Sequence, residues 1–127
     1  MVNKGFRTLI AEANAVVPRI AVEEAQMRLE SGDAVFVDVR ESQEVARGMI
    51  PGAVHAPRGF LEFVADPEGP MHRPEFTGEK TLIVYCASGG RSALAGKTLK
   101  EMGFDDVINL AGGMAAWTQA NGPVARD

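Results

Sequence analysis

The sequence predicts an α/β fold: a doubly wound parallel sheet of about five strands, with helices on both faces. One observation behind this is that the apolar runs at 34–37 and 81–85 are continuous rather than alternating, which is typical of parallel strands buried on both faces. The other is that segments with helical spacing of apolar residues separate such runs. Strands and helices that alternate along the chain favour parallel strands.

The first part of the chain predicts two helices. Apolar side chains with helical spacing precede Pro18 and indicate a short amphipathic helix. A second helix is expected at 22–29, where Gly32 supplies a C-terminal stop. We therefore expect an N-terminal helical extension at residues 1–18 and one α/β domain at 19–127.

The rest of the domain alternates strands with helices. The expected strands are 34–37, 53–56, 81–85 and 107–110. The expected helices are 41–47, 92–102 and a last helix after Gly112-Gly113. Residues 57–80 contain four prolines and are expected to form a surface loop around a helical segment at 59–65.

Composition excludes several classes of function. The net charge is −4 and no basic stripe is present, which argues against a nucleic-acid partner. No apolar run reaches membrane-spanning length and residues 1–20 lack a signal-peptide core, so no membrane partner and a cytoplasmic location are expected. With one cysteine and two histidines, we expect no internal disulfide, no metal and no cofactor.

The single cysteine, Cys86, is the strongest candidate for chemistry. It follows the apolar run 81–85, and ligands of such sheets bind at the carboxyl ends of strands. Backbone N–H groups of a short glycine-containing loop, together with the dipole of the next helix, would stabilise a thiolate there. The loop residues are Ala87, Ser88, Gly89, Gly90, Arg91 and Ser92. The alternative is that Cys86 is a small buried hydrophobic residue.

The segment from Cys86 to Ser92, CASGGRS, resembles the CxxGxRS active loop of the rhodanese family, the single-domain sulfurtransferases. Three further segments resemble the family in the family's order: VFVDVRE at 35–41, GMIPGA at 48–53 and NLAGGMAAW at 109–117. The resemblance covers residues 19 to 122. Met49 departs from it, because the family usually has histidine at that position.

The resemblance implies a two-step sulfur transfer. Cys86 would take sulfur from a small sulfur-containing anion such as thiosulfate, and the resulting persulfide would give it to an external acceptor: cyanide, a thiol or a protein thiol. The six residues from Cys86 to Arg91 match sulfurtransferases, whereas related phosphatases and arsenate reductases have a seven-residue loop. A non-catalytic module that binds proteins or senses sulfur is the main alternative.

Other polar residues are candidates for support. Arg91 either binds substrate oxygens or, as we favour, braces the loop through a carboxylate. Asp38, with Arg40 beside it at a strand end, is a candidate for holding this edge by hydrogen bonds, and Ser92 either caps the helix or contacts the loop. Three side chains in or near the irregular segment are either solvated charges or reach over the cysteine: Arg58, His72 and Arg73.

Overall fold

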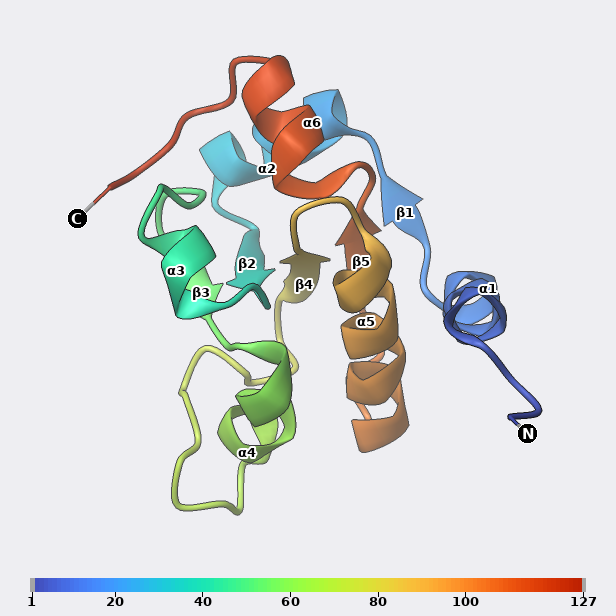
Figure 1. Cartoon of the computed structure of the whole chain (residues 1–127). Coiled ribbons are helices and arrows are strands. Elements are labelled where there is room, and N and C mark those ends of the chain that lie inside the picture. The colour runs from blue at the N-terminus through green and yellow to red at the C-terminus, as the bar shows by residue number, and fades with distance from the viewer. Residues whose placement is uncertain (1, 127) are drawn as a thin grey trace.

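A parallel sheet of five strands forms the centre of the computed structural model, which describes residues 2–126 (Figure 1). The strand order is β1-β5-β4-β2-β3. The bounds are β1 Arg19–Ile20, β2 Ala34–Asp38, β3 Val54–His55, β4 Thr81–Tyr85 and β5 Val107–Leu110. The expected class, a parallel α/β sheet of about five strands, is confirmed. The two-residue β1 was not expected, because so short a strand carries no periodic signal.

Helices cover both faces of this sheet (Figure 1). Their bounds are α1 Phe6–Val16, α2 Val22–Ser31, α3 Ser42–Val45, the 3-10 helix η1 Arg58–Phe60, α4 Leu61–Ala65, α5 Gly90–Met102 and α6 Gly113–Gln119. Their bounds differ from expectation in four places. The helix α3 is shorter than 41–47, α5 begins at Gly90 rather than at 92, and α2 continues to Ser31. The helical segment expected at 59–65 is divided into η1 and α4. Among the described residues, no helix has both the length and the apolar character that a membrane span needs.

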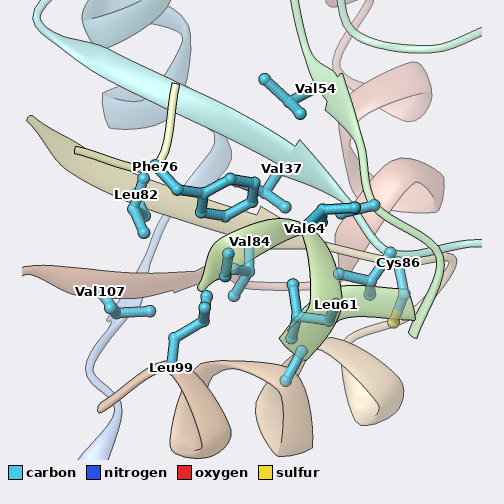
Figure 2. Close-up of a cluster of buried hydrophobic side chains, with 14 of the residues drawn as sticks. Val37, Val54, Leu61, Val64, Phe76, Leu82, Val84, Cys86, Leu99 and Val107 are labelled. Atoms are coloured by element: carbon cyan, nitrogen blue, oxygen red, sulfur yellow. The ribbon is translucent and has the colours of Figure 1, made fainter. Parts of the chain in front are cut away.

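Alternate residues of the central strand β4 enter two separate cores. Leu82, Val84 and Cys86 belong to a cluster beneath α4 and α5, part of which is drawn in Figure 2. Ile83 and Tyr85 belong to the cluster on the opposite face, beneath α2 and α6. Because side chains of a strand point to alternate faces, Cys86 continues the α4–α5 side of the sheet. The cysteine is therefore the last member of a hydrophobic row.

The N-terminal helix α1 lies against α5 at one side of the molecule (Figure 1). Val17, directly after α1, is 1% exposed and joins the core beneath α4 and α5. A Cβ atom on Gly96 would come within 3.0 Å of the Val17 side chain, so glycine allows this close approach. The segment before the sheet thus contributes to the same hydrophobic core as the strands.

Candidate active site

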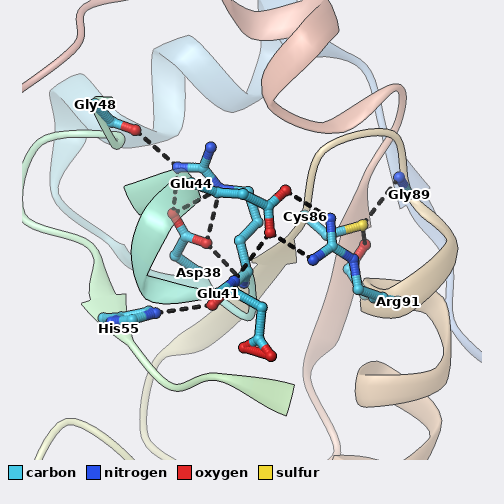
Figure 3. Close-up of polar contacts among 10 residues, drawn as sticks. Asp38, Glu41, Glu44, Gly48, His55, Cys86, Gly89 and Arg91 are labelled. Atoms are coloured by element: carbon cyan, nitrogen blue, oxygen red, sulfur yellow. Dashed lines mark hydrogen bonds and ion pairs between the residues drawn. The ribbon is translucent and has the colours of Figure 1, made fainter. Parts of the chain in front are cut away.

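The loop from Cys86 to Gly89 joins the carboxyl end of β4 to the N-terminus of α5. The Cys86 residue is 1% exposed, and its sulfur accepts a hydrogen bond of 3.1 Å from the backbone N–H of Gly89 (Figure 3). Gly89 has a φ of 118°, a backbone conformation that residues with a Cβ rarely adopt. The loop thus turns a backbone donor onto the sulfur.

The surroundings of Cys86 favour its thiolate. Burial alone would raise the pKa of the thiol. The Ser92 hydroxyl, when its proton turns to the thiolate, and the backbone N–H groups of Ser92, Gly89 and Ser88 outweigh burial and hold the pKa below its ordinary value. These donors are dipoles rather than ions. The arrangement can stabilise a nucleophilic sulfur and an anion formed on it.

The first turn of α6 determines the direction of the loop's peptide groups. The N–H of Met114 donates to the Cys86 carbonyl at 2.8 Å, and the N–H of Ala115 donates to the Ala87 carbonyl at 3.1 Å. Because N–H and C=O point in opposite directions across a trans peptide, the N–H groups that follow these carbonyls point away from α6. Gly113 has a φ of 58°, and a Cβ there would lie 2.5 Å from the Cys86 carbonyl oxygen. Glycine is therefore needed where α6 meets the loop.

Two buried polar side chains hold the other side of the loop. Ser92 is completely buried, its oxygen lies 3.4 Å from the Cys86 sulfur, and its hydroxyl donates to Oδ1 of Asn109 at 2.7 Å. The amide nitrogen of Asn109 donates to the Gly89 carbonyl at 3.1 Å. Of the two roles expected for Ser92, the structure has the contact with the loop. Asn109 was missed, although a polar residue within the apolar strand VINL is a signal for it.

Arg91 forms an ion pair with a carboxylate, which is the role that we favoured over the binding of substrate oxygens. Its two terminal nitrogens bind the two oxygens of Glu44 at 2.7 and 2.9 Å (Figure 3). Glu44 also accepts the backbone N–H of Glu41 at 3.0 Å, within a capping box at the start of α3. The Arg91 contact lowers the pKa of Glu44 from 4.5 to about 2, and Glu44 raises the pKa of Arg91. Glu44 was missed, because sequence spacing does not bring α3 to α5.

Asp38 and Arg40 form a separate network at the end of β2. Nη2 of Arg40 lies 2.8 Å from Asp38, which is completely buried, and also donates to the Gly48 carbonyl at 2.7 Å (Figure 3). Nε2 of His55 lies 2.8 Å from the Arg40 carbonyl. Burial opposes the charge on Arg40, but Asp38 raises its pKa. Within the described chain neither residue has a hydrogen bond to Cys86, so the pair braces the neighbouring strand end.

The three side chains near the irregular segment make contacts elsewhere. Arg58 binds Glu62 at 3.0 Å and Thr98 at 3.1 Å. His72 lies 3.1 Å from the Phe76 carbonyl, and Arg73 lies 3.4 Å from a carboxylate of its own segment. In residues 2–126 none of them has a hydrogen bond to the Cys86 loop, and no group of three or more His, Cys, Asp or Glu side chains is placed to hold a metal ion.

The fold and the site place this protein in the class of α/β domains that carry a cysteine loop at the carboxyl edge of a parallel sheet. Comparison with known proteins identifies the family. The chain matches the rhodanese-like domain over residues 21–120 and belongs to that family. A protein of Allochromatium vinosum named "Sulfurtransferase" is 33% identical over 86% of this chain and 95% of its own length. The "Putative sulfur carrier protein YrkF" of Bacillus subtilis is 34% identical over 85% of this chain, which spans 55% of that longer protein.

Solved structures agree on the fold. A Rhodopseudomonas palustris protein of unknown function, titled a possible tyrosine phosphatase, is 39% identical with a TM-score of 0.93, over 98% of this chain and 97% of that one. The polysulfide-sulfur transferase homodimer of Wolinella succinogenes is 32% identical with a TM-score of 0.75, over 96% of this chain and 88% of that one. Relatives named as sulfurtransferases thus support a rhodanese-type transferase.

Proposed function

We propose that this protein is a sulfurtransferase that carries sulfane sulfur as a persulfide on Cys86. The observation that carries the proposal is the Cys86 sulfur itself, which accepts the Gly89 N–H at 3.1 Å inside a loop of the rhodanese-like family. The sulfurtransferase names of relatives at about a third identity support it. A lowered thiol pKa supplies the nucleophile that the reaction needs.

The first step loads the cysteine. The Cys86 thiolate attacks the outer sulfur of a donor such as thiosulfate and forms a new S–S bond. The old S–S bond of the donor breaks, and its electron pair leaves with sulfite. The charge moves to the outer sulfur of the persulfide, where the N–H groups of Ser88, Gly89 and Ser92 stabilise it.

The second step returns the enzyme to its starting state. An acceptor nucleophile, cyanide in an assay or a thiolate in a cell, attacks the outer persulfide sulfur. The persulfide bond breaks, the thiolate of Cys86 is restored and the acceptor leaves with the sulfur. Because this sequence has one cysteine, no second thiol within it receives the outer sulfur or expels it by forming a disulfide with Cys86, so the acceptor is another molecule.

The charges around the loop favour one class of donor. Arg91 is bound at both ends of its fork by Glu44, and Arg58 is bound to Glu62. Backbone dipoles are therefore the attraction for an anion closest to the sulfur, and Arg19 of β1 adds a cation in the pocket that Ser88 and Gly89 line. Such a site suits a sulfane-sulfur anion whose charge is spread along a chain, such as a polysulfide, better than thiosulfate, whose two charges lie on one compact group. The polysulfide-sulfur transferase of Wolinella succinogenes is a relative whose name agrees with this choice.

A phosphatase is the second candidate, because the structure from Rhodopseudomonas palustris is titled a possible tyrosine phosphatase. Two features of this chain disfavour it. The loop has six residues from Cys86 to Arg91, and Arg91 has both terminal nitrogens on Glu44 instead of open toward a phosphate. A non-catalytic module that senses sulfur or binds proteins is the third candidate, disfavoured by the activated thiol.

The test is the intact mass of the protein after incubation with polysulfide or thiosulfate. We expect a gain of one sulfur that cyanide removes and that Cys86→Ser does not show. Failure of both donors to load the cysteine, in a protein whose Cys86 still reacts with an alkylating agent, would overturn the proposal. Hydrolysis of an aryl phosphate by the wild type but not by Cys86→Ser would establish the phosphatase instead.

A further inference from the structure

The reactive sulfur forms a closed ring of hydrogen bonds with three other residues. Gly89 N–H donates to the Cys86 sulfur at 3.1 Å, and that sulfur lies 3.4 Å from the Ser92 oxygen. Ser92 donates to Oδ1 of Asn109 at 2.7 Å, and Nδ2 of Asn109 donates back to the Gly89 carbonyl at 3.1 Å. The three side chains are each at most 2% exposed. Water therefore has little access to these side chains and does not readily replace a missing donor or acceptor in the ring.

The chemistry of the groups determines where each proton lies. A backbone carbonyl only accepts, so Asn109 must turn its NH₂ group toward Gly89 and its oxygen toward Ser92. An amide oxygen also only accepts, so the one hydroxyl proton of Ser92 lies on the 2.7 Å bond to Asn109. Toward Cys86 the Ser92 oxygen then offers a lone pair. This suits a neutral thiol, which donates its proton to Ser92, and does not suit a thiolate.

We propose that Asn109 is a positioning residue that controls the Cys86 sulfur through the hydroxyl of Ser92. In the resting thiol, Asn109 holds the hydroxyl away from the sulfur. When the sulfur becomes negative, the hydroxyl turns to it, and the buried Asn109 oxygen loses its donor. Asn109 and the thiolate thus compete for one proton. The inference deepens the proposed function and rests on it, because it concerns the state in which Cys86 attacks.

The competition is local, because the charged groups around the sulfur keep their places in every variant. Arg19 of β1, which is in register with Asn109 and lines a pocket with Ser88 and Gly89, is one of these groups. From α5, Arg91 faces the sulfur, but its guanidinium is bound to Glu44 of α3. Glu44 raises the pKa of Arg91 most, and the sulfur raises it further. At the end of β2, the charges of Asp38 and Arg40 compensate each other at 2.8 Å. On the α4 side, Leu61 and Val64 share the hydrophobic cluster of Cys86. A change at Asn109 leaves all of these groups in place.

The test uses two substitutions of Asn109 and the titration of Cys86, the one cysteine of the chain. The pH midpoint is measured from the rate of alkylation and from the ultraviolet absorbance of the thiolate, neither of which needs a sulfur donor. Asn109→Leu and Asn109→Asp both remove the donor to Gly89. They differ at the other end, where leucine releases the Ser92 proton and aspartate binds it more tightly.

We expect Asn109→Leu to lower the midpoint by about half a unit or more, and Asn109→Asp to raise it. In the Ser92→Ala background Asn109→Leu should no longer lower the midpoint, because no hydroxyl then connects residue 109 with the sulfur. Shifts of the same direction in both variants would overturn the proposal, since they would show that Asn109 acts only by anchoring Gly89. A lowering by leucine that persists without Ser92 would overturn it too.

If Asn109→Leu does not fold, Asn109→Asp measured with Ser92 present and in Ser92→Ala still tests the proposal. The upward shift of the midpoint must be larger with Ser92 present than in Ser92→Ala. Equal shifts would mean that the new carboxylate acts on the sulfur directly through space, which contradicts control through the Ser92 hydroxyl. A failure to load sulfur, combined with the expected midpoints, would reject the proposed function and leave the role of Asn109 intact.

Discussion

The ends of β2 and β4 lie side by side in the sheet, where Asp38 is in register with Tyr85, yet they hold their buried polar groups by different means. At the end of β2, the carboxylate of Asp38 is compensated by the full charge of Arg40 at 2.8 Å. At the end of β4, the sulfur of Cys86 has a backbone N–H and a serine hydroxyl as its hydrogen-bond neighbours. One end is built from ions and the other from dipoles.

The difference follows from whether each charge stays in one place. Asp38 and Arg40 form a buried ion pair at fixed positions, so leaving either without its partner is costly. In the proposed reaction the negative charge at Cys86 moves from its own sulfur to the outer persulfide sulfur when sulfur is loaded, and back when sulfur is removed. Fixed dipoles stabilise such a charge without binding the sulfur permanently, and they leave room for a donor or an acceptor. In the proposed reaction, the end of β2 thus provides the rigid support and the end of β4 the place where the charge moves.

Breaking the ionic end should have the largest effect. Asp38→Asn leaves the charge of Arg40 buried without a partner, and we expect a loss of about 3–5 kcal/mol in the free energy of unfolding, measured with urea. The double variant Asp38→Leu with Arg40→Met should lose less than the single one, since it leaves no charge behind. A double variant as unstable as the single one would contradict this account of the β2 end.

Disturbing the Cys86 loop at the end of β4 should reduce activity and leave the paired charges in place. In Gly113→Ala the new Cβ would lie 2.5 Å from the Cys86 carbonyl oxygen, so α6 must move away from the loop. We expect sulfur uptake by Cys86 to slow about a hundredfold, measured by mass. Gly52→Ala is the matched control, because Gly52 has a φ of 77° with no atom near its Cβ position. Equal slowing in both variants would point to backbone strain instead of the clash.

The exposed ion pair that joins α3 to α5 should have a smaller effect. Glu44 and Arg91 are 32% and 39% exposed, and we expect Glu44→Gln to cost about 1 kcal/mol in the free energy of unfolding. Because the folded pKa of Glu44 is lowered, this stabilisation is present above 4.5 and is lost as the pH falls toward about 2.

Glu62→Gln is the control for that experiment, since it removes a similarly exposed pair with Arg58. It should cost less than Glu44→Gln and leave the acid dependence between 4.5 and about 2 unchanged. An acid dependence that is identical in the wild type and in Glu44→Gln would remove Glu44 as its source.

The smallest effect should be a rise in stability toward alkaline pH. The folded pKa of Cys86 lies below its ordinary value of 9.0, so the folded state releases the thiol proton first. The resulting stabilisation is complete above the unfolded pKa and is lost as the pH falls through the folded one. Urea unfolding from neutral to mildly alkaline pH should show this rise in the wild type and not in Cys86→Ala. A rise that Cys86→Ala retains would mean that another group causes it.

The sequence predicted the main elements because their signals are local. Strand 107–110 has the expected bounds, and the helix after 22 ends at Gly32, whose φ of 72° is the left-handed conformation that glycine allows. The position of Cys86 after a strand follows from the apolar run 81–85 alone. The parts that sequence reasoning missed, Glu44 and Asn109, reach the loop from other elements. Their distances in sequence from Cys86 carry no pattern that predicts contact.

Arg58 shows the opposite case. Its position in the irregular segment 57–80 made it a candidate to reach the cysteine, but Glu62 of α4, four residues later, and Thr98 of α5 bind its guanidinium. The nearby Glu62 was visible in the sequence and was a sufficient explanation. At Met49, which departs from the usual histidine of the family, the backbone pairs with Ala125 through both its N–H and its carbonyl, and these contacts do not depend on the side chain.

The contacts of α6 with the Cys86 loop impose an order in time on the newly made protein. A ribosome adds Cys86 before it adds Asn109, and it adds Met114 and Ala115 later still, although their N–H groups orient the loop carbonyls. A nascent or truncated chain that stops before Gly113 therefore carries the thiol without the peptide groups that direct it. Its cysteine should react like one in an unfolded peptide. Cys86 is synthesised first, and the N–H groups that orient its loop follow only with α6.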